Sequence, residues 1–164
     1  MTAPDDDEPI EVSSPVCYAH EFEDYARPPR LQAAELTAFL NVLLESERAG
    51  ARVLARWCHE ATPDAGVGAD TLAAVRDDEA RYCAGLTEHL QRLGAEPSHA
   101  TGRFYDKAMT IAAWPDRLRF LDKGQSWVAR EIRDKLPRIE DQALSAFLQE
   151  MLERHEHNLK LCAV

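Results

Sequence analysis

The stretch Leu43–Val53, LLESERAGARV, places an acid where a helix would be expected to carry an apolar side chain. Residues three or four positions apart share one face of a helix, and on that spacing Glu47 lies between Leu43 and Leu54. A carboxylate inside such a stripe is either exposed, hydrogen-bonded, paired with a charge or bound to a metal ion. The stretch therefore predicts an amphipathic helix that carries a polar site on its inward face.

The same helical period recurs along the chain and predicts an all-α protein. Breakers separate the periodic segments, among them the loop 62–68 and Pro137, and no strand-like alternation competes with the helical pattern. A short amphipathic run, FYDKAMTIA at 104–112, lies in the long connection after the second segment. The pattern predicts a four-helix bundle of two antiparallel helix pairs, joined by a long crossover that carries a short helix. The four long helices are expected at about 32–61, 70–93, 115–136 and 141–161.

Charge and composition divide the 164 residues into a tail and one domain. The first 26 residues hold eight acids and no Lys or Arg, so the rest of the chain has 21 acids against 19 bases. We expect residues 1–30 to form an acidic, proline-containing, largely flexible arm, and residues 31–164 to form the bundle. The nearly neutral body predicts no nucleic-acid partner.

Location is predicted from what the chain lacks. It has no apolar run of about 18 residues, which predicts no membrane span. The amino terminus does not have the order of a secretory signal, and the four cysteines are widely spaced, so we expect a cytoplasmic protein with reduced thiols.

Each predicted helix interrupts its apolar face with a polar residue, and these interruptions fall at one height. Heights follow from counting ~1.5 Å of rise per residue from the connections. One shared site explains the coincidence better than four separate accidents. The interrupting residues are Glu47 in the first helix, Glu79 and Tyr82 in the second, Asp122 or Gln125 in the third and His155 in the fourth.

Carboxylates that converge with an imidazole in a dry interior suit a divalent transition metal, because a cation offsets the cost of burying anions. We therefore predict a metal site, with Tyr82 and Gln125 next to the ligands. The alternatives are a Glu47 or Glu79 carboxylate bonded to Tyr82 or to a nearby arginine, and a His155 held by one of the two acids. The predicted metal ligands are Glu47, Glu79, His155 and Asp122. The other histidines His59, His89, His99 and His157 are expected at the surface.

These segments also resemble a known group of proteins. Glu47, together with EARY at 79–82 and the following CAGLTEHLQRLG, is similar to the first half of the ferritin-like superfamily, which includes bacterioferritin and rubrerythrin. In that superfamily the first helix supplies a Glu and the second supplies Glu-x-x-His. More narrowly, the segments 47–53, 78–94 and 151–158 resemble an uncharacterised bacterial ferritin-like family of unknown function.

The resemblance implies a ferritin-like bundle over residues 35–162 that binds iron or manganese and acts as an oxidoreductase in oxygen or peroxide chemistry. The chain departs from the pattern in two places: Tyr82 stands where the second helix should have His, and Leu152 stands where the fourth should have Glu. A reduced or mononuclear metal site is therefore expected. The alternative is a scaffold without metal that acts as a helical interaction module or binds a small molecule. Whether the protein is an enzyme stays open, and exposed apolar edges are compatible with a homodimer.

Overall fold

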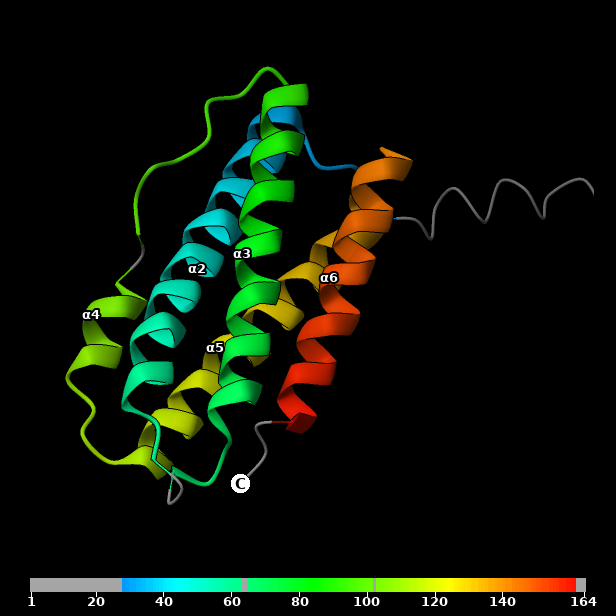
Figure 1. Ribbon diagram of the computed structural model, residues 1–164. Coiled ribbons are helices and arrows are strands. Elements are labelled where there is room, and N and C mark those ends of the chain that lie inside the picture. Colours follow the sequence, from blue (N-terminus) through cyan, green and yellow to red (C-terminus); the bar gives the residue numbers. More distant parts are fainter. Residues whose placement is uncertain (1–27, 63–64, 102, 162–164) are drawn as a thin grey trace, which may run out of the picture.

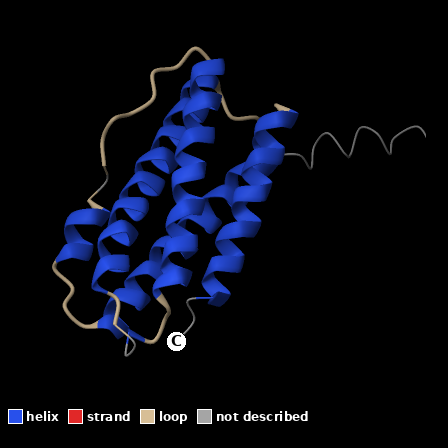
Figure 2. Ribbon diagram, in the orientation of Figure 1, coloured by secondary structure: helices blue, strands red, loops and turns tan. Residues whose placement is uncertain are grey.

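The computed structural model describes residues 28–62, 65–101 and 103–161, and the fold in these ranges is entirely helical. No described residue belongs to a strand, as Figure 2 shows, which confirms the all-α prediction. The bounds of the four long helices lie within one residue of those predicted. The elements are α2 (Ala33–Glu60), α3 (Ala69–Arg92), α4 (Phe104–Met109), α5 (Trp114–Lys135), the 3₁₀ helix η3 (Leu136–Arg138) and α6 (Gln142–Leu161).

Local chemistry at the helix ends explains why the bounds were predictable. The backbone N–H of Gln32 donates to the Glu35 carboxylate over 3.0 Å, which closes the first turn of α2. Asp141 accepts a hydrogen bond from the N–H of Leu144 over 2.8 Å at the start of α6. After α3, Gly94 adopts φ +69°, the left-handed conformation that ends many helices.

The four long helices form a ring in which each packs against two others (Figure 1). The packed pairs are α2 with α3, α3 with α6, α6 with α5, and α5 with α2. Helices α2 and α6 therefore face each other across a diagonal, as do α3 and α5. The crossover from α3 to α5 runs down the outside of α2, where Arg48 donates to the carbonyl of Ala100 over 2.6 Å, and it places α4 beside α2 (Figure 1).

Buried apolar side chains gather in two clusters along this ring. The first draws on α2, α3, α5 and α6 and includes Leu40, Leu86, Val128 and Leu148. The second contains Trp57 and draws on α2, α3, α4 and α5, without a described residue of α6. The polar layer that the sequence predicts lies where the two clusters meet. None of the described helices combines the length and the apolar character that a membrane span requires.

The predicted arm, residues 1–30, lies outside the described residues except for its last three. In this described end, the carbonyl of Pro29 accepts a hydrogen bond from Arg138 Nε over 2.7 Å, and Leu31 N–H donates to the Arg138 carbonyl over 3.0 Å. The chain that leads into α2 is thereby fastened to the turn between α5 and α6.

One prediction about the surface was wrong. His89 is buried, with its ring centroid 4.9 Å from that of Phe147 on α6, because α6 packs over this part of α3. His59, His99 and His157 are exposed, as predicted.

Truncation of a core leucine should measure how much the first cluster contributes to stability. Leu148 is fully buried, so we expect Leu148→Ala to lower the free energy of unfolding by about 2–5 kcal/mol. Leu93 is 44 % exposed, and Leu93→Ala should change the free energy of unfolding by less than about 0.5 kcal/mol. Urea denaturation followed by circular dichroism checks both. Similar losses for the two variants would contradict the assignment of Leu148 to the core.

Candidate functional site

Four polar side chains are buried at the level where the two apolar clusters meet. Glu47 comes from α2, Glu79 from α3, Gln125 from α5 and His155 from α6, and none is more than 4 % exposed. Their backbone positions follow from the helical period, since each occupies the inward face of its own helix. The sequence predicted this layer, and the structure brings these four residues to it.

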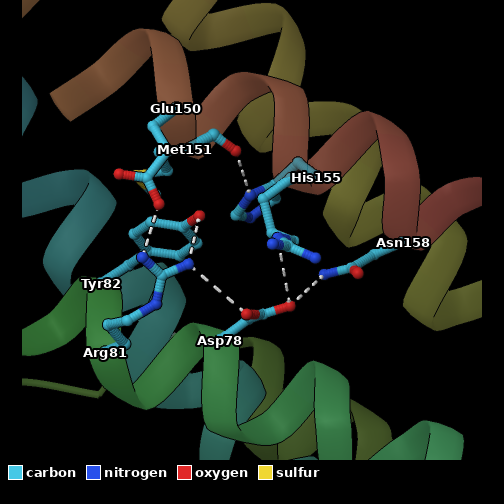
Figure 3. A network of polar contacts seen from close by, with 8 residues as sticks. Asp78, Arg81, Tyr82, Glu150, Met151, His155 and Asn158 are labelled. Atoms are coloured by element: carbon cyan, nitrogen blue, oxygen red, sulfur yellow. Dashed lines mark hydrogen bonds and ion pairs between the residues drawn. The ribbon is translucent and has the colours of Figure 1, made fainter. Parts of the chain in front are cut away.

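His155 is held between a backbone carbonyl and a carboxylate. Its Nδ1 lies 3.0 Å from the carbonyl oxygen of Met151, one turn earlier on α6, and its Nε2 lies 3.2 Å from Glu47 Oε1 (Figure 3 shows the Met151 contact). A carbonyl only accepts, so Nδ1 carries a hydrogen and Nε2 faces the acid. Burial opposes the charged imidazolium, but the charge of Glu47 and its hydrogen bond outweigh this and raise the pKa of His155. The Glu47 contact therefore favours the charged imidazolium to a higher pH than burial alone would allow.

Glu79 lies in a more constrained position. Gln125 Nε2 donates to its Oε1 over 2.6 Å. Its carboxylate also packs on the backbone of Gly50, where an added Cβ would overlap the carboxylate oxygens. Burial, and then the charge of Glu47, raise the pKa of Glu79 well above its ordinary value, although the bond from Gln125 opposes the shift. The protonated form of Glu79 is therefore favoured.

Several buried polar atoms in this layer have no hydrogen-bond partner among the described residues. They include one oxygen of each acid, Glu47 Oε2 and Glu79 Oε2, and the amide oxygen of Gln125. Buried polar groups in proteins are nearly always satisfied by protein, water or an ion. The two free carboxylate oxygens therefore mark a place where a further group is expected.

Two predicted site residues do not contact the acids. Asp122 lies about one turn before Gln125 on α5 and lines a separate surface hollow, where burial raises its pKa. The layer is thus completed by Gln125 and not by Asp122. The hydroxyl of Tyr82 accepts a hydrogen bond from Arg81 over 2.9 Å, while its ring packs 5.9 Å from that of His155. The Tyr82 ring therefore forms part of the wall of the site, and its hydroxyl does not hydrogen-bond to either carboxylate.

The three remaining ligand candidates do not form a complete metal cage in this arrangement. Glu47 contacts His155, and Glu79 is near enough for the charge of Glu47 to raise its pKa. Within the described ranges, however, no three His, Cys, Asp or Glu side chains are grouped at a spacing that could hold a metal ion. Ion binding would require at least one of the three side chains to move.

A polar network between α3 and α6 surrounds His155 (Figure 3). Asp78 lies 3.7 Å from Arg154 and 3.5 Å from the amide of Asn158, which is 2 % exposed. Arg81 bridges from Asp78 to Glu150 on α6. These contacts fix α6 against α3 on the outer side of the layer. These contacts could not be predicted from the sequence, since the acid next to Glu79 has no distinguishing signal of its own.

A cavity of about 350 Å³ opens beside the layer, between α2, α4 and α5. Its size falls within the range of small-molecule sites in proteins. Glu47, Gly50, Glu79 and Gln125 are at one side of it. The cavity was not predicted from the sequence; its local signals are Gly50 and Gly124, which are unusual residues for the interiors of long helices. The remaining walls include Phe104, Phe120, Leu121, Trp127 and Val128.

Comparison with known proteins identified one family. The family model described as "Domain of unknown function (DUF6306)" matches residues 34–164, a range that spans all but the first residue of the helical fold. A search of curated proteins and a search of solved structures found no match.

The raised pKa of Glu79 predicts a pH-dependent stability. The unfolded chain releases this proton near 4.5 and the folded chain retains it, so stability should fall as pH rises above 4.5, by at most about 1.4 kcal/mol per pH unit for one proton. Glu79→Gln keeps the acceptor for Gln125 but removes the titration, and its urea midpoint should fall less steeply with pH. The exposed control Glu153→Gln should follow wild type. Parallel curves for wild type and Glu79→Gln would contradict a protonated Glu79.

The overlap at Gly50 predicts a substitution effect of unusual sign. Gly→Ala inside a helix normally stabilises, but Gly50→Ala should destabilise by about 1–3 kcal/mol because the new methyl group displaces the Glu79 carboxylate. When Glu79 is also replaced by Ala, Gly50→Ala should no longer be destabilising. A double-mutant cycle of unfolding free energies measures the difference. An equal cost in both backgrounds would show that the side chain of Glu79 is not the obstacle.

Proposed function

The chain belongs to the DUF6306 family, a domain family of unknown function, and we propose that it binds a divalent metal ion, iron or manganese, through Glu47, Glu79 and His155. The two buried carboxylate oxygens without a partner among the described residues carry this proposal. A cation between them would satisfy both oxygens and offset the charge of the acids. Carboxylates and a neutral imidazole are ligands that both metals accept.

The orientation of His155 also supports the proposal. The carbonyl of Met151 accepts the Nδ1 hydrogen, so the neutral imidazole would present the lone pair of Nε2 on the side of Glu47. Metal-binding histidines are commonly held in this way by a second partner. Gln125 would hold one oxygen of Glu79 and leave the other for the ion. Ligation would require a deprotonated Glu79 and a neutral His155, so metal binding would compete with protons at both groups.

We further propose that the ring of four helices is a ferritin-like bundle. Support comes from the order of the long helices, from the crossover that follows α3, and from the placement of Glu47 and Glu79 on neighbouring helices. Bound iron would supply redox chemistry with oxygen or peroxide, which is the activity that the resemblance implies. The chain's own part in such chemistry would be to hold the ion among buried side chains, with the fully buried Tyr82 on one side and the cavity lined by Glu47 and Glu79 as the approach for oxygen or peroxide.

A second candidate function is the binding of a small molecule without a metal. It is favoured by the cavity beside the layer and by the incomplete grouping of the three ligand candidates. The two candidates differ in what must occupy the space next to the two carboxylate oxygens, so metal content distinguishes them.

Metal stoichiometry tests the leading proposal. Full-length protein purified without a histidine tag and loaded anaerobically with Fe(II) or Mn(II) should retain one ion per chain, as measured by mass spectrometry. Glu47→Gln, Glu79→Gln and His155→Gln should each weaken binding at least about tenfold, since each removes a ligand. Circular dichroism should show that the variants remain helical.

Matched controls lie on the outer face of α6. Glu153→Gln and His157→Gln remove an exposed acid and an exposed histidine, and both should bind the metal as wild type does. Absence of a bound ion under every loading condition, or equal binding by all five variants, would overturn the proposal and leave the second candidate.

A further inference from the structure

The cavity beside the polar layer has an apolar wall built by α4 and α5. Phe104 stacks on Phe120 with their ring centroids 4.5 Å apart, and both rings line the cavity. Gly124 makes this stacking possible, because a Cβ at that position would lie 2.8 Å from the Phe104 ring. Leu121 and Trp127 extend the same wall. The cavity therefore suits the apolar body of a small molecule.

Three cationic side chains also line the cavity. Arg103 and Lys107 come from the α4 region and Lys123 from α5, and all three are exposed, which places them at the opening to solvent. None of them forms an ion pair with an acidic side chain in the described ranges. Their positive charges would attract an anion to the mouth of the cavity.

One oxygen of each acid at the inner side of the cavity already has a polar partner. Glu47 Oε1 lies 3.2 Å from His155 Nε2, and Glu79 Oε1 accepts a hydrogen bond from Gln125 Nε2 over 2.6 Å. These side chains are buried, whereas the three cationic side chains are exposed. The cavity thus has a cationic mouth and a buried inner side whose acids are held by partners.

We propose that this cavity binds a small organic acid with an apolar body. The body lies against Phe104, Phe120 and Trp127, and the carboxylate lies at the mouth, where Lys107 and Lys123 can donate charge-assisted hydrogen bonds to it. The opposite polarity is disfavoured, since a cationic ligand would have to pass the three like charges at the mouth. The proposal does not depend on metal binding, because none of the residues that contact the acid is a proposed metal ligand.

Calorimetric titration of the full-length protein with octanoate and with 1-octanol tests this proposal. The two probes share an apolar chain and differ in the head group. Octanoate should bind with one site per chain and more tightly than octanol. The double variant Lys107→Gln, Lys123→Gln should weaken octanoate binding at least about tenfold, while leaving octanol binding unchanged.

Two further comparisons make the result specific. The control double variant Arg130→Gln, Lys160→Gln removes the same charge at exposed positions outside the cavity and should bind octanoate as wild type does. Ser46→Leu and Gly124→Ala narrow the cavity from opposite sides, the second by displacing Phe104. Both variants should weaken the binding of both probes. A thermal melt confirms that each variant is folded.

Three results would overturn the proposal: no binding of octanoate, equal binding of the two probes, or equal losses in the two double variants. Titrations before and after metal loading separate this proposal from the previous one. Octanoate binding by protein that takes up no metal would support the acid site alone, and metal uptake without octanoate binding would leave only the metal site.

Discussion

Two carboxylates buried at the centre of the ring constrain the rest of this structure. The Glu47–His155 contact joins α2 to α6, and the Glu79–Gln125 contact joins α3 to α5. Each contact spans a diagonal of the ring, between helices whose backbones are not packed together. Two diagonals must pass close to one another at the centre, which explains why the charge of Glu47 acts on Glu79. The polar layer therefore fixes the relative heights of all four helices, because a shift of any one would leave a buried acid without its partner.

The same crossing determines the chemistry available to the layer. Glu47 pairs with an imidazole that can carry a positive charge, whereas Glu79 has only the neutral amide of Gln125 as its partner. A proton on Glu79 would remove the cost of a buried negative charge, and a cation beside both acids would offset that charge. The two ways exclude each other at a given site, so metal binding and protonation are linked: raising the pH should favour the ion. The close approach of Gly50 matters here, since it is the missing side chain at this position that leaves room for the Glu79 carboxylate.

How much of this could be predicted depends on whether a feature is local or tertiary. Helix bounds were predictable because they are set by nearby residues such as Asp141 and Gly94. The inward faces were predictable from the helical period, which placed Glu47 correctly. The choice between Asp122 and Gln125 was not predictable. It depends on a height difference of one helical turn, which is comparable to the uncertainty of a helix boundary predicted from sequence. The direction of the Tyr82 hydroxyl could not be predicted either, since it depends on a contact with Arg81 at the surface of the packed pair α3 and α6.

The cavity was the least predictable feature, and its origin lies in the crossover. The second apolar cluster contains no described residue of α6, and α4 contributes to it from the opposite side of the ring. Because α4 has only six residues, it covers part of the groove between α2 and α5 and leaves the remainder open next to the polar layer. The position of α4 is set by contacts far apart in sequence, such as that of Arg48 with the Ala100 carbonyl, which no periodic pattern reveals. The crossover thus does more than connect the two helix pairs. It supplies Phe104 to the aromatic wall, and Arg103 and Lys107 to the cationic mouth through which the buried acids are approached from solvent. Variation in its sequence would therefore change which ligand reaches the acids without altering the layer itself.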